Sequence, residues 1–349
     1  MLFIDCQRRE ISKETPKKRF EKITSIKHYD FFCRNEIDVC RIITKQEGFQ
    51  YFFSPVVGYK KVKLSENGAM LYENQVQEII QLDKIYLNMD YYIPSSHLKK
   101  TFTEYYGFSS GLRDFMTKKQ YLLKLVQSFQ FGLKTMYKLN QTKLVHMQLF
   151  PKNILFMDDN KMILTNFSHS FHFENIKHER NLISQLFSTY DVKNIYLPLE
   201  AHLLSFMQTK KLGSLSLSNI EEVAYSWKSA IKQSSIGRYL TDEYFGEDPF
   251  FLSLLSLTNK RQREIEDKIL DYSKGWNAYA YGILFLQLCR FFETLVPNAQ
   301  RFSKSFVFEL QNLIHVNPNE RKELDLVSKD TMNSIFKIEE SEWMEICSM

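Results

Sequence analysis

Apolar residues recur three and four positions apart in two stretches of the chain. Over 31–44 they include Cys33, Ile37 and Ile43, and over 122–137 they form a longer stripe of the same kind. This spacing places the apolar side chains on one face of a helix. The pattern therefore predicts one helix over 31–44 and a second, core-facing helix that ends near 137.

Short apolar segments bounded by turn residues predict strands elsewhere. Residues 154–157 and 162–164 flank a turn of two aspartates, an asparagine and a lysine, which is typical of a strand, a turn and a second strand. Residues 56–72 carry an Asn-Gly pair at 67–68, and this pair favours the positive φ angles of a tight hairpin turn. We therefore expect a β-hairpin over 56–72.

The remaining pattern is less regular. Residues 75–107 are rich in tyrosine and isoleucine and fit either an insertion or an edge strand. Within 205–274 we expect a helix over 218–232, which begins with a capping box at its first serine, an apolar helix led by Pro249, and a charged helix over 260–270.

Composition limits the classes of protein that fit. The 349 residues are 44% hydrophobic, which is enough for a sizeable core, and the net charge of +5 gives no reason to expect nucleic-acid or membrane binding. The five cysteines show no Cys-x-x-Cys spacing, so neither a zinc site nor a disulfide framework is expected, and a reducing compartment fits them. We expect no signal peptide and no membrane-spanning helix, because no apolar run is long enough.

One loop gathers the side chains with candidate chemistry. The run 146–156 reads His-Met-Gln-Leu-Phe-Pro-Lys-Asn-Ile-Leu-Phe, and Asn-Phe-Ser follows at 166–168. This frame resembles the catalytic loop H-R-D-L-x-x-x-N and the D-F-G motif of protein kinases. In that resemblance His146 stands for the histidine, and Asn153 stands for the asparagine that binds a second magnesium ion.

The residues that do not match are those that carry the reaction. Gln148 stands where a kinase has its catalytic aspartate, and Asn166 stands where it has the aspartate that holds magnesium. Both are amides and have neither charge nor basicity. The resemblance therefore implies a degenerate site at Gln148, Asn153 and Asn166, with His146 and Phe167 kept as structural residues.

The first part of the chain is similar to a kinase small lobe in outline only. The predicted helix over 31–44 resembles helix C of that family, and this makes Glu36 the acid that pairs with a nucleotide-binding lysine, with Lys22 as the candidate. Either residue could equally be a surface residue. No glycine precedes Gly48, so the glycine-rich loop that covers the phosphates of ATP is absent from the sequence before that point.

The later part of the chain carries two further similarities. Tyr-Leu-Pro-Leu-Glu at 196–200 resembles the Ala-Pro-Glu motif, so Glu200 is expected to be buried and to pair with Arg321 of the loop Asn-Pro-Asn-Glu-Arg. The apolar run 276–286 resembles the buried central helix of the large lobe and contains Gly282.

The fold class that follows is α+β, with a two-lobed protein-kinase-like fold, a reduced β-rich N-lobe and a large helical C-lobe. The N-lobe is expected at 1–74, a hinge-side insertion or edge strand at 75–107, and the C-lobe at 108–349. Ordinary kinases have a short loop where this chain has 205–274, so we expect that segment to be a helical insertion that could be removed without unfolding the domain.

The resemblance implies a pseudokinase that acts as a scaffold or protein-interaction module and binds a protein partner through 205–274. No cofactor or metal is then expected. The alternative is a divergent serine/threonine kinase that uses ATP and magnesium with another acid, for which Asp158 and Asp159 are the only carboxylates near in sequence. The style of the motifs is similar to kinase-like proteins of large DNA viruses, and the expected location is cytoplasmic, including host cytoplasm or a virion.

Overall fold

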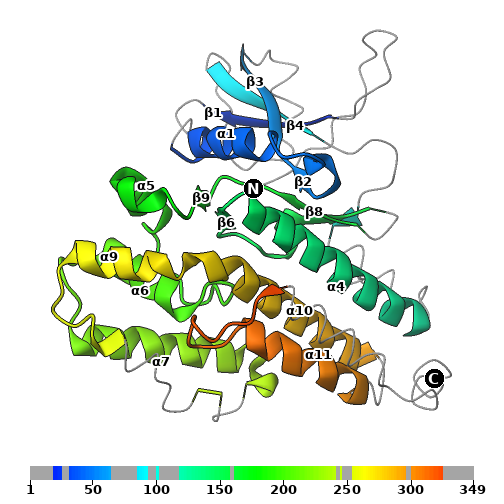
Figure 1. Ribbon diagram of the computed structural model, residues 1–349. Helices are drawn as coiled ribbons and strands as arrows, with labels where there is room; N and C mark the ends of the chain where they lie inside the picture. Colours follow the sequence, from blue (N-terminus) through cyan, green and yellow to red (C-terminus); the bar gives the residue numbers. More distant parts are fainter. Residues whose placement is uncertain are drawn as a thin grey trace, which may run out of the picture.

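The protein is a mixed α+β structure with several small sheets and a larger set of helices (Figure 1). A three-stranded sheet and one helix lie at the top of the view, and most of the other helices lie below. The computed structural model describes residues 19–25, 31–63, 85–92, 100–101, 118–157, 161–240, 244–245, 254–295 and 300–324.

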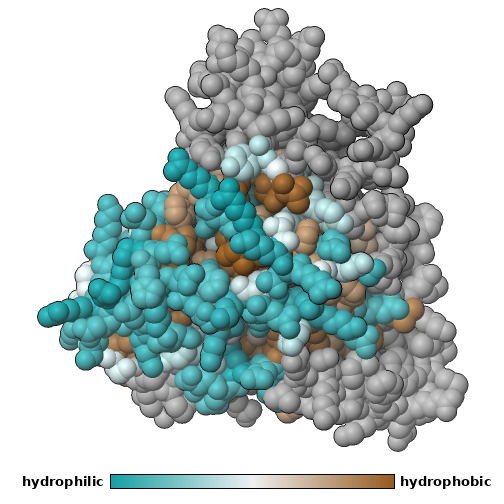
Figure 2. Space-filling model, turned by 45° about the horizontal axis from the view of Figure 1, so that its top comes forward, coloured by the Kyte–Doolittle hydropathy of each residue, from teal (hydrophilic) through white to brown (hydrophobic). Residues whose placement is uncertain are grey.

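The surface of the helical part is largely hydrophilic, with a few hydrophobic groups near the centre of the face seen in Figure 2. In the described part of the chain, no helix combines the length and the apolar character needed to cross a membrane.

The upper sheet has the strand order β1-β4-β3, and both strand pairs are antiparallel. Its strands are β1 (Arg19–Ser25), β4 (Ile85–Tyr92) and β3 (Val56–Lys63). The hairpin partner expected for β3 lies outside the described residues, whereas β4 comes from the range 75–107 that the sequence left open. That range supplies the central strand of this sheet, so the boundary expected after residue 74 cuts through it.

Helix α1 (Phe31–Ile43) packs under this sheet, as the apolar spacing predicted. Cys40 and Ile43 on its inner face have no exposed surface. Glu36 lies on the same face and is also completely buried. A carboxylate in that position needs polar partners, because an isolated buried charge is costly.

A second sheet lies between α1 and the lower helices. Its order is β2-β8-β7-β5, with β2 parallel to β8 and the other pairs antiparallel. Its strands are β2 (Phe53–Ser54), β8 (Met162–Thr165), β7 (Ile154–Phe156) and β5 (Lys100–Thr101). The predicted strand-turn-strand is thus confirmed as β7 and β8, with residues 158–160 outside the described part.

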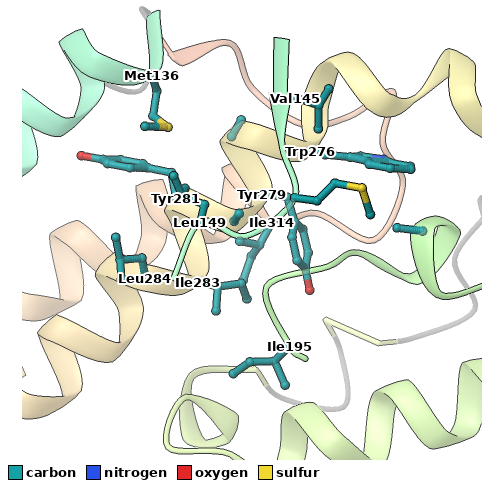
Figure 3. Close-up of a cluster of buried hydrophobic side chains, with 14 of the residues drawn as sticks. Met136, Val145, Leu149, Ile195, Trp276, Tyr279, Tyr281, Ile283, Leu284 and Ile314 are labelled. Carbon is teal, nitrogen blue, oxygen red and sulfur yellow. The ribbon is translucent and has the colours of Figure 1, made fainter. Parts of the chain in front are cut away.

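The helical core is built around α10 (Trp276–Leu295), which packs between α4 (Lys118–Gln141) and α11 (Gln300–Leu313). The predicted helix ending near 137 is confirmed as α4. Figure 3 shows the buried cluster that α10 forms with the segments around it. A Cβ atom on Gly282 would lie 2.5 Å from Cγ2 of Ile314, so only glycine allows α10 to approach the end of α11 this closely.

The segment 205–274 contains the end of α6 (Leu199–Lys210), then α7 (Leu217–Gln233) and α9 (Gln262–Asp271). The helices expected over 218–232 and 260–270 are therefore confirmed, while the one led by Pro249 lies outside the described residues. The capping residue of α7 is Ser216 rather than the serine two positions later. Its Oγ accepts from the backbone N–H of Asn219 at 3.2 Å, and Asn219 Oδ1 accepts from its N–H at 3.0 Å.

Part of this segment packs into the hydrophobic core. The side chain of Trp227 is buried beside Tyr279 of α10. Arg238 forms an ion pair at 3.4 Å with Glu293, also in α10, whose carboxylate is almost completely buried. Removing 205–274 would expose these surfaces and leave Glu293 without that partner. The expectation of a separable insertion stays a prediction.

Candidate functional site

The candidate site lies where the loop after β6 (Leu144–His146) meets the loop before β9 (Ser170–His172). These two short strands pair antiparallel, with His146 opposite Ser170. The antiparallel pairing of β7 with β8 brings the segment after Thr165 to the same place. Two parts of the chain that are 18 residues apart in sequence therefore share one network of side chains.

His146 is the buried anchor of this region. Its Nε2 lies 3.0 Å from the carbonyl oxygen of Thr165, and its ring packs edge-on against Phe167 with 5.1 Å between ring centroids. Burial lowers the pKa of His146 to about 4, so the ring is neutral at pH 7 and Nε2–H donates to the carbonyl. A neutral, buried histidine with these contacts holds the loop against Thr165 and Phe167.

Asn277 at the start of α10 fixes the same strand from below. Its Oδ1 accepts from the backbone N–H of His146 at 2.9 Å, and its Nδ2 donates to the carbonyl of Leu144 at 2.7 Å and to Oδ1 of Asn140 at 3.0 Å. The amide thus satisfies one backbone N–H and one backbone carbonyl of the strand without introducing a charge.

Three amides and a serine form the centre of the site. Nδ2 of Asn166 donates to Oε1 of Gln148 at 3.0 Å and to Oδ1 of Asn153 at 3.1 Å. Oδ1 of Asn166 accepts from Oγ of Ser168 at 3.0 Å. Asn153 and Asn166 are 1% and 2% exposed, so these hydrogen bonds replace contacts with water. We call Gln148, Asn153, Asn166 and Ser168 the amide network.

The direction of these hydrogen bonds follows from one fixed contact. Nδ2 of Asn153 donates to the backbone carbonyl of Gln148 at 2.8 Å, so the oxygen of the Asn153 amide must face Asn166. Because that oxygen can only accept a hydrogen bond, the Asn166 amide must turn its NH₂ group, and not its oxygen, toward Asn153. Asn166 has a φ of 62°, in the left-handed region that asparagine tolerates better than most residues.

A residue of α1 extends the network toward the upper sheet. Nδ2 of Asn35 donates to the carbonyl oxygens of Ser168 at 2.9 Å and Ser170 at 2.8 Å. Beside it, the ring of Phe32 stacks on His169 with 4.2 Å between centroids. Helix α1 is therefore attached directly to the segment that carries the amide network.

Of the pair expected between Lys22 and Glu36, the structure describes the side chain of Glu36 only. Lys22 lies in β1 opposite Met89, and its side chain is outside the described part of the structure. Glu36 accepts a hydrogen bond from the Tyr91 hydroxyl, and burial together with the nearby carboxylate raises the pKa of Tyr91 well above its ordinary value. The pair with Lys22 remains a prediction.

The buried ion pair expected from the sequence is present. Nη1 and Nη2 of Arg321 donate to the two carboxylate oxygens of Glu200 at 2.6 and 3.1 Å. Nε1 of Trp276 donates to the same carboxylate at 3.1 Å, and Nε of Arg321 donates to the carbonyl of His315 at 2.9 Å. This pair attaches α6 to the loop after α11, away from the amide network.

The chemistry available to the amide network is limited by its composition. Its members are neutral, and their hydrogen bonds go to one another, to backbone carbonyls and to a histidine ring. In the described part of the chain, no group of three or more His, Cys, Asp or Glu side chains could hold a metal ion. These residues can hold a loop in place, but they offer no strong base for proton abstraction.

The sequence pattern brings together Gln148, Asn153 and Asn166 but does not identify two contributors, Ser168 and Asn35. The one available signal for Asn35 was its place beside Glu36 in an otherwise amphipathic helix.

Comparison with known proteins adds nothing to this geometry, since no family model and no curated protein matches the chain.

Proposed function

We propose that this chain has a two-lobed protein-kinase-like fold and acts as a pseudokinase, a non-catalytic protein that binds a partner. The order of elements supports the proposal: a small sheet with a helix comes first, then a long helix, then the loops of the candidate site between short strands, and finally a buried helix. The motif residues His146 and Phe167 pack together beneath that loop.

The observation that carries the proposal is the double hydrogen bond from the Asn166 amide to Gln148 and Asn153. In an active kinase an aspartate at this motif position would hold magnesium. Here the NH₂ group of Asn166 meets the two amide oxygens that a cation would otherwise approach. The amide groups therefore satisfy one another's hydrogen bonds, which supports a non-catalytic site.

Two further observations fit a non-catalytic role. Gln148, at the position of the catalytic base, uses its side-chain oxygen to accept from Asn166. The side chains of Cys33, Cys40 and Cys289 are buried and form no disulfide with one another, which fits a reducing intracellular environment. We propose that the protein acts inside the cell, with a protein as its partner.

The experiment is a phosphotransfer assay on the purified protein with radiolabelled ATP, magnesium or manganese, and generic protein substrates. We expect no transfer to the protein itself or to a substrate. Metal-dependent transfer that disappears in Asn153→Ala would overturn the proposal and establish the alternative, a divergent serine/threonine kinase. That alternative needs a carboxylate outside the amide network, and its candidates Asp158 and Asp159 are outside the described residues.

A further inference from the structure

An exposed group of cations lies where α6 ends and α9 begins. The loops at 211–215 and 258–262 run side by side, because the backbone N–H of Gln262 donates to the carbonyl of Gly213 at 2.8 Å. The N–H of Asn259 also donates to the carbonyl of Leu215 at 2.9 Å. Five exposed basic side chains surround this contact. We call them the α6–α9 basic surface: Lys210, Lys211, Lys260, Arg261 and Arg263.

These cations are not neutralised by the described part of the protein. Arg263 makes a long ion pair at 3.9 Å with Asp267, and the other four make no ion pair with any described residue. A basic residue elsewhere in this chain often has a partner, as Lys143 has Glu174 at 2.7 Å. Charges of one sign that are gathered and unpaired produce a local positive potential, and that potential attracts an acidic ligand.

The surface is held rigidly. Glu266, one turn into α9, is almost completely buried and accepts hydrogen bonds from Gln208 of α6 at 2.6 Å and from Gln262 at 2.7 Å. The same carboxylate forms an ion pair with Arg180, the first residue of α5 (Arg180–Leu186). The cations are therefore presented by a fixed junction of three helices, and binding there would require little ordering of the backbone.

We propose that the α6–α9 basic surface is the docking site for a short acidic segment of a partner protein. This inference rests on the proposed binding role and names its location and its chemistry. The surface favours a peptide over a nucleic acid, because Glu264 of α9 is an exposed carboxylate next to Arg263 and repels a continuous phosphate backbone. Exposed Leu217, at the start of α7, adds an apolar contact that a peptide side chain can use.

The test is a fluorescence anisotropy titration of the full-length protein with a labelled ten-residue peptide of glutamate, aspartate and leucine. Its matched probe replaces every acid by the corresponding amide, and a single-stranded oligonucleotide of equal charge serves as the competitor. We expect the acidic peptide alone to bind, with an affinity that decreases as the salt concentration rises. The charge reversal Lys211→Glu/Lys260→Glu should weaken binding roughly tenfold.

The matched control is Lys45→Glu/Lys134→Glu, which changes the net charge equally at two exposed positions, one in the turn after α1 and one on α4. It should bind the acidic peptide as the unmodified protein does. Thermal unfolding of both variants should be unchanged, because every substituted side chain is exposed.

An acidic peptide that fails to bind, or that binds both double variants equally, overturns the docking site. Preferential binding of the oligonucleotide overturns the choice of a peptide. None of these results bears on catalysis, which the phosphotransfer assay decides separately. A protein that transfers phosphate would refute the pseudokinase even if the acidic peptide binds.

Discussion

Arg321 binds both carboxylate oxygens of Glu200 although 121 residues separate the two in the chain. Their side chains are 3% and 0% exposed, so neither charge has access to water as an alternative partner. Such a pair joins distant segments strongly, because breaking it leaves a buried charge behind.

We therefore expect Glu200→Gln and Arg321→Met each to lower the free energy of unfolding by about 3–5 kcal/mol. The double substitution should cost less than the sum of the two, because each single substitution strands the same opposite charge. Urea denaturation of the unmodified protein, the two single variants and the double variant measures these free energies of unfolding. The half-exposed pair Lys143 and Glu174 is the control, and removing either of its residues should cost about 0–1 kcal/mol. Additive effects at Glu200 and Arg321 would show that the residues do not interact.

A single substitution in the amide network should create dependence on a divalent cation. Asn166→Asp replaces the donor NH₂ by an anionic oxygen that faces two amide oxygens, and aspartate also tolerates the left-handed backbone at this position. Without metal the variant should lose about 1–3 kcal/mol of stability, because the oxygens of Gln148 and Asn153 lose their donor. Magnesium or manganese should restore the melting temperature.

The control for this effect is Asn153→Ala combined with Asn166→Asp. It removes one of the converging oxygens and should weaken the response to metal. The unmodified protein should melt at the same temperature with magnesium and with a chelator. If Asn166→Asp unfolds at the same temperature with and without metal, the three oxygens do not converge as the hydrogen bonds indicate.

Restoring both acids should not produce a kinase. A kinase divides its work among the glycine-rich loop, a strand lysine, metal ligands and a base, and parts that act as a unit are not recovered singly. We expect Gln148→Asp/Asn166→Asp to fold in the presence of magnesium and to transfer no phosphate from ATP. Phosphorylation of a generic substrate by this variant would mean that the remaining parts are functional, and it would contradict the scaffold role.

Two buried histidines make stability depend on pH. Burial lowers the pKa of His146 and of His202 to about 4, whereas both titrate near 6.5 in the unfolded chain. As the pH falls below about 6.5 the unfolded chain takes up protons before the folded protein does. The stabilisation is therefore complete above that pH and is lost toward pH 4.

From pH 7 to pH 5 the loss should amount to roughly 2 kcal/mol for each histidine. Denaturant titrations at the two pH values measure it, and His202→Gln should remove its share of the difference. His178 is exposed, so His178→Gln should leave the difference unchanged. An unchanged pH dependence in His202→Gln would show that this ring is not the group responsible.

The sequence predicted the parts of the structure that local pattern controls. The stripe from Leu122 to Tyr137 identified α4, and the spacing of His146, Gln148 and Asn153 identified the centre of the candidate site. The ion pair of Glu200 with Arg321 was expected from the resemblance of 196–200 and of the loop ending at Arg321 to kinase motifs, and the need of a buried carboxylate for a partner agrees with it. These inferences depend on neighbours in the chain or on motif resemblance.

Other features depend on which segments pack together in the folded protein. The local sequence pattern carries no information about that packing. The helices over 218–232 and 260–270 were recognised, but the burial of Trp227 beside Tyr279 depends on the path of the intervening chain. The capping serine of α7 was placed two residues too late, and Leu215, just before Ser216, forms a β-bridge with Thr258 that the local pattern does not predict. The central position of β4 is also a property of the assembled sheet.

The double hydrogen bond from Asn35 has a mechanical consequence. Asn35 sits on a helix that packs under one sheet, while both of its acceptors belong to the segment of Ser168 and Ser170. A displacement of α1 would therefore act, through the Asn35 side chain, on the backbone close to Asn166. A ligand that displaced α1 would loosen the amide network from a distance, and the backbone amide protons around residue 168 would exchange with solvent faster.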